Sequence, residues 1–153
     1  SSSLYFNNKK SNNFLFLSNR LGLADSIDGN LKTNNTFSLG GLNFKGFDYR
    51  GIGPFLDNTY LGGNKFFTST FGYGSNFLFD QKDNVYLKTF ITTGSIWESD
   101  YSQNDEFKLR TSVGISFDIL TPVAPLTVSY AIPILKTDSD IKRSFNFSLG
   151  TSF

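Results

Sequence analysis

The chain lacks three residue types on which many enzyme and metal sites depend. Its 153 residues include no histidine, no cysteine and no methionine. The absence of histidine excludes histidine-based catalytic triads and most zinc sites, and the absence of cysteine excludes disulfides and thiolate metal sites. The acidic residues fall mainly in segments that we expect to be loops. We therefore predict no metal ion, no cofactor and no enzymatic activity.

Charge of one sign and long apolar runs are also missing. Lysine and arginine total 14 against 13 aspartates and glutamates, so the net charge is +1. Without a basic stripe, a nucleic-acid partner is not expected. No apolar run approaches the roughly 18 residues of a transmembrane helix. Transmembrane β-strands remain possible, since they need only about ten residues of alternating apolar and polar side chains.

The chain is rich in aromatic residues and glycine, with 18 phenylalanines, 7 tyrosines and 14 glycines. Together with frequent threonine and serine, this composition favours β-structure. Alternation of apolar and polar residues predicts an all-β protein, and the strongest example is Glu106–Leu120. The first ten residues match the end of a further strand. We expect six long strands, at Asn12–Ser26, Asn64–Ser75, Val85–Trp97, Glu106–Leu120, Leu126–Ile134 and Ser144–Phe153.

Two architectures fit these strands. In a soluble sandwich or lipocalin-like barrel the apolar face lies inside, whereas in an outer-membrane barrel it meets lipid and the polar face lines a wet lumen. The strands exceed the usual globular length of about five or six residues, which favours the membrane barrel. Short turns at Asp80–Asn84 and Thr121–Pro125 alternate with longer hydrophilic loops, as periplasmic turns alternate with extracellular loops.

The segment Gly40–Gly53 carries five glycines and one lysine, Lys45, and it is followed by Pro54. A glycine-rich loop with a cation suggests a phosphate-binding loop. However, Lys45 precedes Gly46 and no serine or threonine follows, so the GxxxxGK[ST] pattern is absent. The segment lies within the long stretch Gly29–Tyr60, which has little periodicity of its own, and a loop of that length is usually functional.

Several segments resemble the BamA family, the β-barrel assembly proteins of bacterial outer membranes, and most closely an alphaproteobacterial or rickettsial member. The similarity runs from about residue 12 to residue 153. The segments, in the order found in the family, are Leu42–Phe47 for the (V/I)RGF motif of loop six, Gly51–Pro54, Leu61–Asn64, Phe90–Trp97 for FxDxGxxW, Ser112–Gly114 and Thr121–Leu126 for SxG…SPxGPL, and Phe145–Phe153 for the terminal β-signal.

The resemblance implies a transmembrane antiparallel β-barrel of about sixteen strands, of which residues 1–153 form the last six or so. The N-terminal strands and the periplasmic POTRA domains are not in this chain. Since six strands would leave two unpaired edges in lipid, we expect the chain to be part of a longer protein and not a closed six-stranded pore.

The resemblance also implies a site. In the family, loop six folds into the lumen and its arginine pairs with an acid on the FxDxG strand. The corresponding loop-six residues here are Phe44, Lys45, Gly46 and Phe47, and the inward strand residues are Phe90, Thr92 and Gly94.

Three residues differ from those that form the family's ion pair between loop six and the barrel strands. Lys45 replaces the arginine, Thr92 replaces the aspartate, and Gly72 stands at the position of a glutamate on the preceding strand. Lysine cannot form the bidentate contact of arginine with a carboxylate, and with no acid opposite, Lys45 has at best a hydroxyl or carbonyl partner there. Two interpretations remain open: a looser anchor of the loop, or a lysine simply solvated in a wet lumen.

The function implied is non-enzymatic insertion of β-barrel proteins into the outer membrane. In the family the last strand opens as a lateral gate, and a substrate strand adds to its edge. Gly150 either kinks this strand or fits a crowded lumen wall. The corresponding residues of the last strand are Phe145, Phe147, Leu149, Gly150 and Phe153.

The expected partners are outer-membrane lipids and lipopolysaccharide, unfolded β-barrel substrates and accessory assembly lipoproteins. The alternative function is a barrel of the same superfamily that translocates or secretes polypeptides, of the two-partner secretion type or the mitochondrial sorting-and-assembly type. The expected location is the bacterial outer membrane, with the mitochondrial outer membrane as the alternative. A plain diffusion porin is a third possibility, and porins lack the motif Phe44–Phe47.

Overall fold

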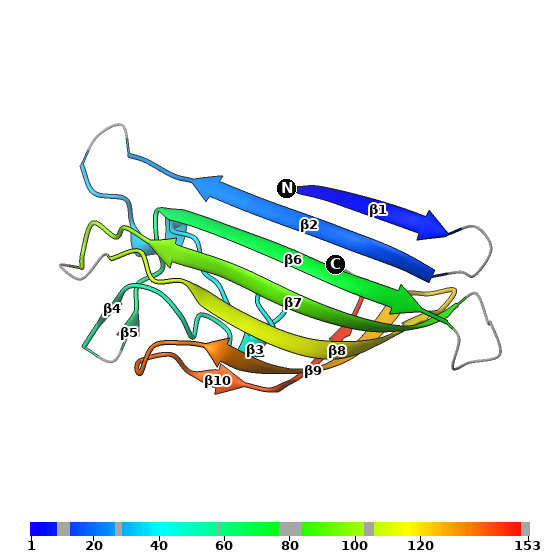
Figure 1. The fold of residues 1–153 in the computed structure, drawn as a ribbon. Helices are drawn as coiled ribbons and strands as arrows, with labels where there is room; N and C mark the ends of the chain where they lie inside the picture. The colour runs from blue at the N-terminus through cyan, green and yellow to red at the C-terminus, as the bar shows by residue number, and fades with distance from the viewer. Residues whose placement is uncertain (9–12, 27–28, 58, 77–83, 103–105, 151–153) are drawn as a thin grey trace.

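The computed structural model describes residues 1–8, 13–26, 29–57, 59–76, 84–102 and 106–150. Seven strands form one antiparallel sheet in the order β1-β2-β6-β7-β8-β9-β11 (Figure 1). No described ladder joins β1 to β11, so the sheet is open. No helix in the described part of the chain is long and apolar enough to span a membrane. The strands are β1 (Ser2–Asn8), β2 (Asn13–Leu23), β6 (Lys65–Ser75), β7 (Val85–Trp97), β8 (Arg110–Leu120), β9 (Pro125–Leu135) and β11 (Phe145–Leu149).

The structure corrects several predicted limits. The sheet contains the six predicted long strands, and Ser2–Asn8 forms the further strand that the first ten residues suggested, paired along its whole length with β2. Strand β8 begins at Arg110 and not at Glu106, and β11 ends at Leu149. The predicted turn Asp80–Asn84 lies outside the described residues except for Asn84.

The long stretch Gly29–Tyr60 contains short elements of its own, which the sequence did not reveal. These are η1 (Thr33–Asn35), β3 (Gly46–Phe47), β4 (Phe55–Leu56) and β5 (Thr59–Tyr60). Strands β4 and β5 pair with each other, and β3 pairs with β10 (Lys142–Arg143), which precedes the last strand.

The apolar side chains of the large sheet lie on its outer face. Tyr73, Ile115, Tyr130 and Phe145 are linked across the sheet by the strand register and are 41%, 51%, 54% and 58% exposed. In a lipocalin-like barrel or a sandwich these side chains would be buried. An apolar face of this extent suits lipid, because a soluble monomer rarely exposes so large a patch.

The inner face is polar, and aromatic rings lie across its glycines. A Cβ atom added to Gly72 would lie 2.4 Å from Cζ of Phe16, and one added to Gly114 would lie 2.7 Å from Cζ of Phe90. Each ring therefore occupies the volume that a side chain at its glycine would need. This explains glycines in strand interiors, where glycine otherwise weakens a strand.

The small hydrophobic core lies between the Gly29–Tyr60 stretch and the sheet. Ile96 of β7 is its buried sheet residue, and Phe66 of β6 packs against it together with Phe37. Hydrophobic packing thus holds the loop against the inward side of the sheet. The other core residues, all from the loop, are Leu39, Phe44, Phe47 and Ile52.

Candidate functional site: the glycine loop on the inward face of the sheet

The two phenylalanines of the loop-six motif are buried in the core between the loop and the sheet. Phe44 is 1% exposed and Phe47 is 0% exposed. Their rings meet nearly edge to face, with centroids 5.1 Å apart, an arrangement favourable for aromatic pairs. Between them, Gly46 has φ +99°, and a Cβ there would lie 3.0 Å from Cβ of Ser112 on β8. The motif therefore needs glycine both for its backbone conformation and for close approach to the sheet.

Lys45 projects over the inward strand residue Phe90. Its Nζ lies 5.0 Å from the centroid of the Phe90 ring, within the range of a cation–π contact. Both residues and Thr92 line one small pocket on the inner face of the sheet. No hydroxyl or carbonyl partner of Lys45 is found among the described residues, and the hydroxyl of Thr92 bonds that of Thr70 at 2.9 Å.

Gly94, the third predicted strand residue, does not itself line this pocket. It is opposite Thr68 on β6 and Arg110 on β8. A Cβ on Gly94 would lie 2.5 Å from the backbone oxygen of Phe67. The structure thus brings Lys45, Phe90 and Thr92 together, and it gives Gly94 a packing role in the strand ladder.

The electrostatic surroundings of Lys45 differ from a simple lysine–carboxylate pair. Burial lowers the pKa of the Lys45 ammonium below its ordinary value, while Asp118 partly opposes this effect and Lys88 adds to it. Asp118 itself is bound by Lys88, with Nζ 2.5 Å from Oδ2. Since Asp118 is already paired, Lys45 lies in a desolvated and net positive part of the inner face.

Restoring the two family acids is expected to have opposite effects. Thr92→Asp places a carboxylate in the pocket of Lys45 and should stabilise the folded protein by about 1 kcal/mol. Gly72→Glu should destabilise it by about 1–3 kcal/mol, because the new Cβ would overlap the Phe16 ring. Chemical unfolding of the two full-length variants in detergent tests both signs. Stabilisation by Gly72→Glu would contradict the packing explanation.

The segment between β9 and β11, residues 136–144, holds the loop on the sheet and is called the clamp below. Ile141 makes two backbone bonds with the loop: its oxygen accepts from N–H of Asp48 at 2.9 Å, and its N–H donates to the oxygen of Gly51 at 2.9 Å. The adjoining pair β3–β10 extends this contact. Arg143 adds an exposed ion pair, with Nη1 3.3 Å from Oδ1 of Asp48. The loop is therefore tied by main-chain bonds to the segment that leads directly into the last strand.

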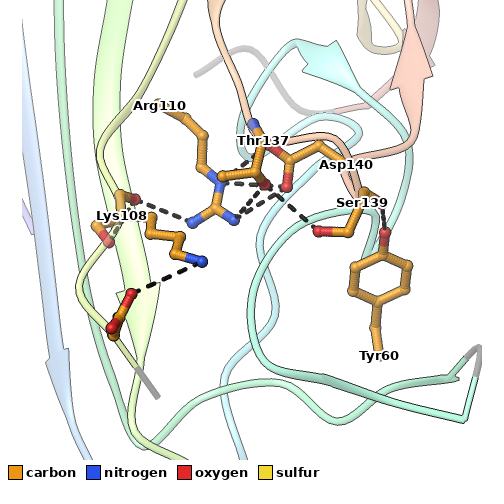
Figure 2. A network of polar contacts seen from close by, with 8 residues as sticks. Tyr60, Lys108, Arg110, Thr137, Ser139 and Asp140 are labelled. Carbon is orange, nitrogen blue, oxygen red and sulfur yellow. Dashed lines mark hydrogen bonds and ion pairs between the residues drawn. The ribbon is translucent and has the colours of Figure 1, made fainter. Parts of the chain in front are cut away.

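A buried ion pair holds this clamp in place (Figure 2). Arg110 begins β8 and Asp140 lies in the clamp, and their side chains are 3% and 0% exposed. Nη2 of Arg110 donates to Oδ1 of Asp140 at 2.9 Å, and Nε lies 3.1 Å from Oδ2. Arg110 Nη1 also donates to the oxygen of Lys108, and N–H of Thr137 donates to Asp140 at 2.7 Å. The pair is bidentate and well hydrogen-bonded, as a buried ion pair must be.

Tyr60 extends the same network from the β4–β5 hairpin. Its hydroxyl donates to the backbone oxygen of Ser139, beside Asp140 (Figure 2). Burial raises the pKa of the Tyr60 hydroxyl, with a further contribution from Asp140 and an opposing one from Arg110. Tyr60 therefore remains a neutral donor at physiological pH, and it joins the hairpin to the clamp.

Sequence reasoning missed the Arg110–Asp140 pair. Arg110 belongs to Glu106–Leu120, which the sequence predicts as a strand, but nothing in the sequence links it to Asp140. The signal was available in part, since an arginine among small inward residues of a barrel strand needs a partner. Its partner, 30 residues further along the chain, required the tertiary structure.

The last strand is short and has one described neighbour. Phe145, Phe147 and Leu149 are 58%, 56% and 66% exposed on the outer face. Gly150 has φ +101° and follows the strand end, and its N–H donates to the oxygen of Pro125 at 2.8 Å. A Cβ on Gly150 would meet no described atom within 4 Å, so the described residues do not crowd this position. Phe153 lies outside the described residues.

The fold and the site define a class of protein. An open antiparallel sheet carries an apolar outer face and a polar inner face, and a glycine loop packs on the inner face. This is the wall of a transmembrane β-barrel with a loop folded into its lumen.

Comparison with known proteins agrees with this class. The Omp85 superfamily domain matches residues 2–153, and the chain belongs to the Omp85 superfamily. The fold is similar to the crystal structure of BamA from Haemophilus ducreyi lacking POTRA domains 1–3, with a TM-score of 0.79 and 22% identity. That match covers 95% of this chain and 32% of the other, so the chain spans about a third of that structure's length.

The superfamily and the structural match confirm the coarser predictions. The fold is an all-β antiparallel sheet that corresponds to a segment of a BamA barrel. Omp85 proteins are outer-membrane β-barrels and non-enzymatic assembly or transport proteins. The prediction of a protein without enzymatic activity is thereby confirmed, while the choice between assembly and transport is a separate question.

Proposed function

We propose that this chain is the C-terminal part of the barrel of a bacterial BamA-type insertase, which folds β-barrel proteins into the outer membrane. Substrate strands would add to the edge of β11 through a lateral gate. The observation that carries the proposal is the form of this strand: β11 has five residues, whereas β8 and β9 have 11 each. The described strand limits the ladder at its other edge to the same five residues, and a short ladder is easier to open because fewer main-chain bonds are lost.

The full-length protein would carry residues 1–153 as the end of a bacterial surface antigen-type barrel, preceded by POTRA domains and further strands. Its partners would be outer-membrane lipids and lipopolysaccharide, unfolded β-barrel substrates and accessory assembly lipoproteins. The exposed apolar outer face supports the lipid contact. The motif Phe44–Phe47 would act as the lumenal loop that supports the barrel wall next to the gate.

A cysteine cross-link to a stalled substrate tests the gate. The chain has no native cysteine, so Ser148→Cys on β11 adds one thiol at the strand edge. Ser129→Cys on β9 is the matched control, because Ser129 lies between two paired strands, opposite Ser116 and Asn146. We expect a substrate barrel with a cysteine in its terminal strand to cross-link to Ser148→Cys at least tenfold more than to Ser129→Cys.

The alternative function gives another result. In a translocation or secretion barrel the polypeptide passes through the lumen, where both Ser129 and Ser148 face inward. Equal cross-linking at the two positions would favour translocation. Absence of cross-links to assembling barrels at both positions would contradict the insertase proposal.

A further inference from the structure

The pocket beside Lys45 has the composition of an anion site. Its volume is about 60 Å³, and it is lined by three cationic side chains, those of Arg20, Lys45 and Lys88. No carboxylate lines it among the described residues. Cavities of this kind need several polar partners to hold a bound species. The remaining lining residues are Phe16, Ser18, Leu42, Asn43, Thr68, Thr70, Phe90, Thr92 and Ser116.

The two lysines of the pocket are not neutralised equally by the protein. Lys88 is paired with Asp118 at 2.5 Å. Lys45 faces the Phe90 ring, and no described carboxylate lies within ion-pair distance of its Nζ. A half-buried ammonium without an acid is unfavourable unless a counter-charge is supplied.

Neutral donors complete the pocket. The hydroxyls of Thr70 and Thr92 are 2.9 Å apart and share one hydrogen bond. Two hydroxyls carry two protons, and a shared bond uses one of them, so the second can point into the pocket. Ser116 on β8 adds a further hydroxyl to the lining. Ammonium and hydroxyl groups together are a donor set for an anion.

We propose that this pocket binds a small inorganic anion, such as chloride or inorganic phosphate, beside the hydroxyls of Thr70 and Thr92. The anion contacts the Lys45 ammonium and bridges the loop to strands β6 and β7. The loop is thus held by an exchangeable ion and not by a carboxylate side chain of the protein. Anion binding in this pocket does not depend on the proposed insertase function.

The experiment uses the full-length protein in detergent. Its unfolding temperature is measured in sodium bromide or sodium phosphate against sodium gluconate at equal ionic strength, and crystals grown in bromide locate the halide by anomalous scattering. We expect a saturable rise in the unfolding temperature and a bromide peak within 4 Å of Lys45 Nζ. Thr92→Asp and Lys45→Gln should each weaken the apparent affinity at least tenfold.

The matched control is Lys32→Gln, which removes an exposed lysine from the same loop and should leave the affinity unchanged. Thr92→Asp supplies its own counter-charge, so it tests the site even where Lys45→Gln folds poorly. Equal anion responses in wild type and Thr92→Asp would overturn the proposal. A bromide peak found only away from the pocket would do the same. A response to phosphate without one to bromide would restrict the ligand to oxyanions within the proposed class.

Discussion

Replacing Arg110 with methionine is expected to lower the free energy of unfolding by about 3–5 kcal/mol, the usual effect of breaking a buried ion pair from one side. The carboxylate of Asp140 is fully buried, and without Arg110 its remaining charge would be met mainly by N–H of Thr137. The clamp that holds the loop through Ile141 should then detach. Chemical unfolding of the full-length variant in detergent measures the loss.

Two comparisons make this prediction specific. Arg143→Met removes the other arginine–aspartate pair of the clamp, whose side chains are 56% and 40% exposed, and an exposed pair contributes only about 0–1 kcal/mol. The double variant Arg110→Met, Asp140→Leu should recover most of the lost stability, because it leaves no unpaired buried charge. Equal effects of Arg110→Met and Arg143→Met would show that the buried pair does not hold the clamp.

Replacing Gly40 with alanine is expected to disrupt the loop itself. Gly40 has φ +120°, and a Cβ there would lie 1.8 Å from the backbone oxygen of Asp48. Neither atom belongs to a flexible side chain, so the loop backbone must move. Backbone strain of about 1–3 kcal/mol and a similar overpacking term together predict a loss of about 3 kcal/mol or more.

The exposure of position 45 shows whether the loop has moved away from the sheet. With Lys45→Cys in the same protein, Gly40→Ala should increase the labelling rate of that thiol by an impermeant maleimide. Gly29→Ala is the control: Gly29 has φ +74°, but nothing lies within 4 Å of its added Cβ, so only strain of about 1–3 kcal/mol applies. If Gly40→Ala left both the labelling rate and the unfolding free energy at the values of Gly29→Ala, the close approach would not matter to the loop.

The sequence alone determined the strand pattern. Side chains alternate between the two faces of a strand, so a period of two is visible without any knowledge of pairing. Val85–Trp97 was predicted with the limits that the structure has. A predicted strand limit was wrong where the sequence pattern and the strand pairing disagree. Glu106–Leu109 continues the alternation, but β8 begins at Arg110.

The motif residues were also visible in the sequence, because their order along the chain matches a family. Their contacts were not. The sequence left open a loose anchor or a solvated lysine at Lys45, and the structure places its ammonium over the Phe90 ring. The sequence shows only that Gly72 stands where the family has a glutamate. The structure explains the glycine, because the ring of Phe16 occupies the space that a side chain there would need. Both contacts depend on strand register, which periodicity does not specify.

The tertiary structure decided three further matters: which face of the sheet is outside, how the loop lies on the inner face, and which charges are paired. Alternation is the same for a lipocalin-like barrel and a membrane barrel, so the packing of Phe44 and Phe47 against Ile96 was needed to identify the inner face. Arg110 and Asp140 are separated along the chain, and they meet because Thr111 of β8 lies opposite Leu135 of β9, which brings the segment after β9 beside the start of β8. Local sequence carries no information about such long-range partners, since their proximity results from the folding of the whole sheet.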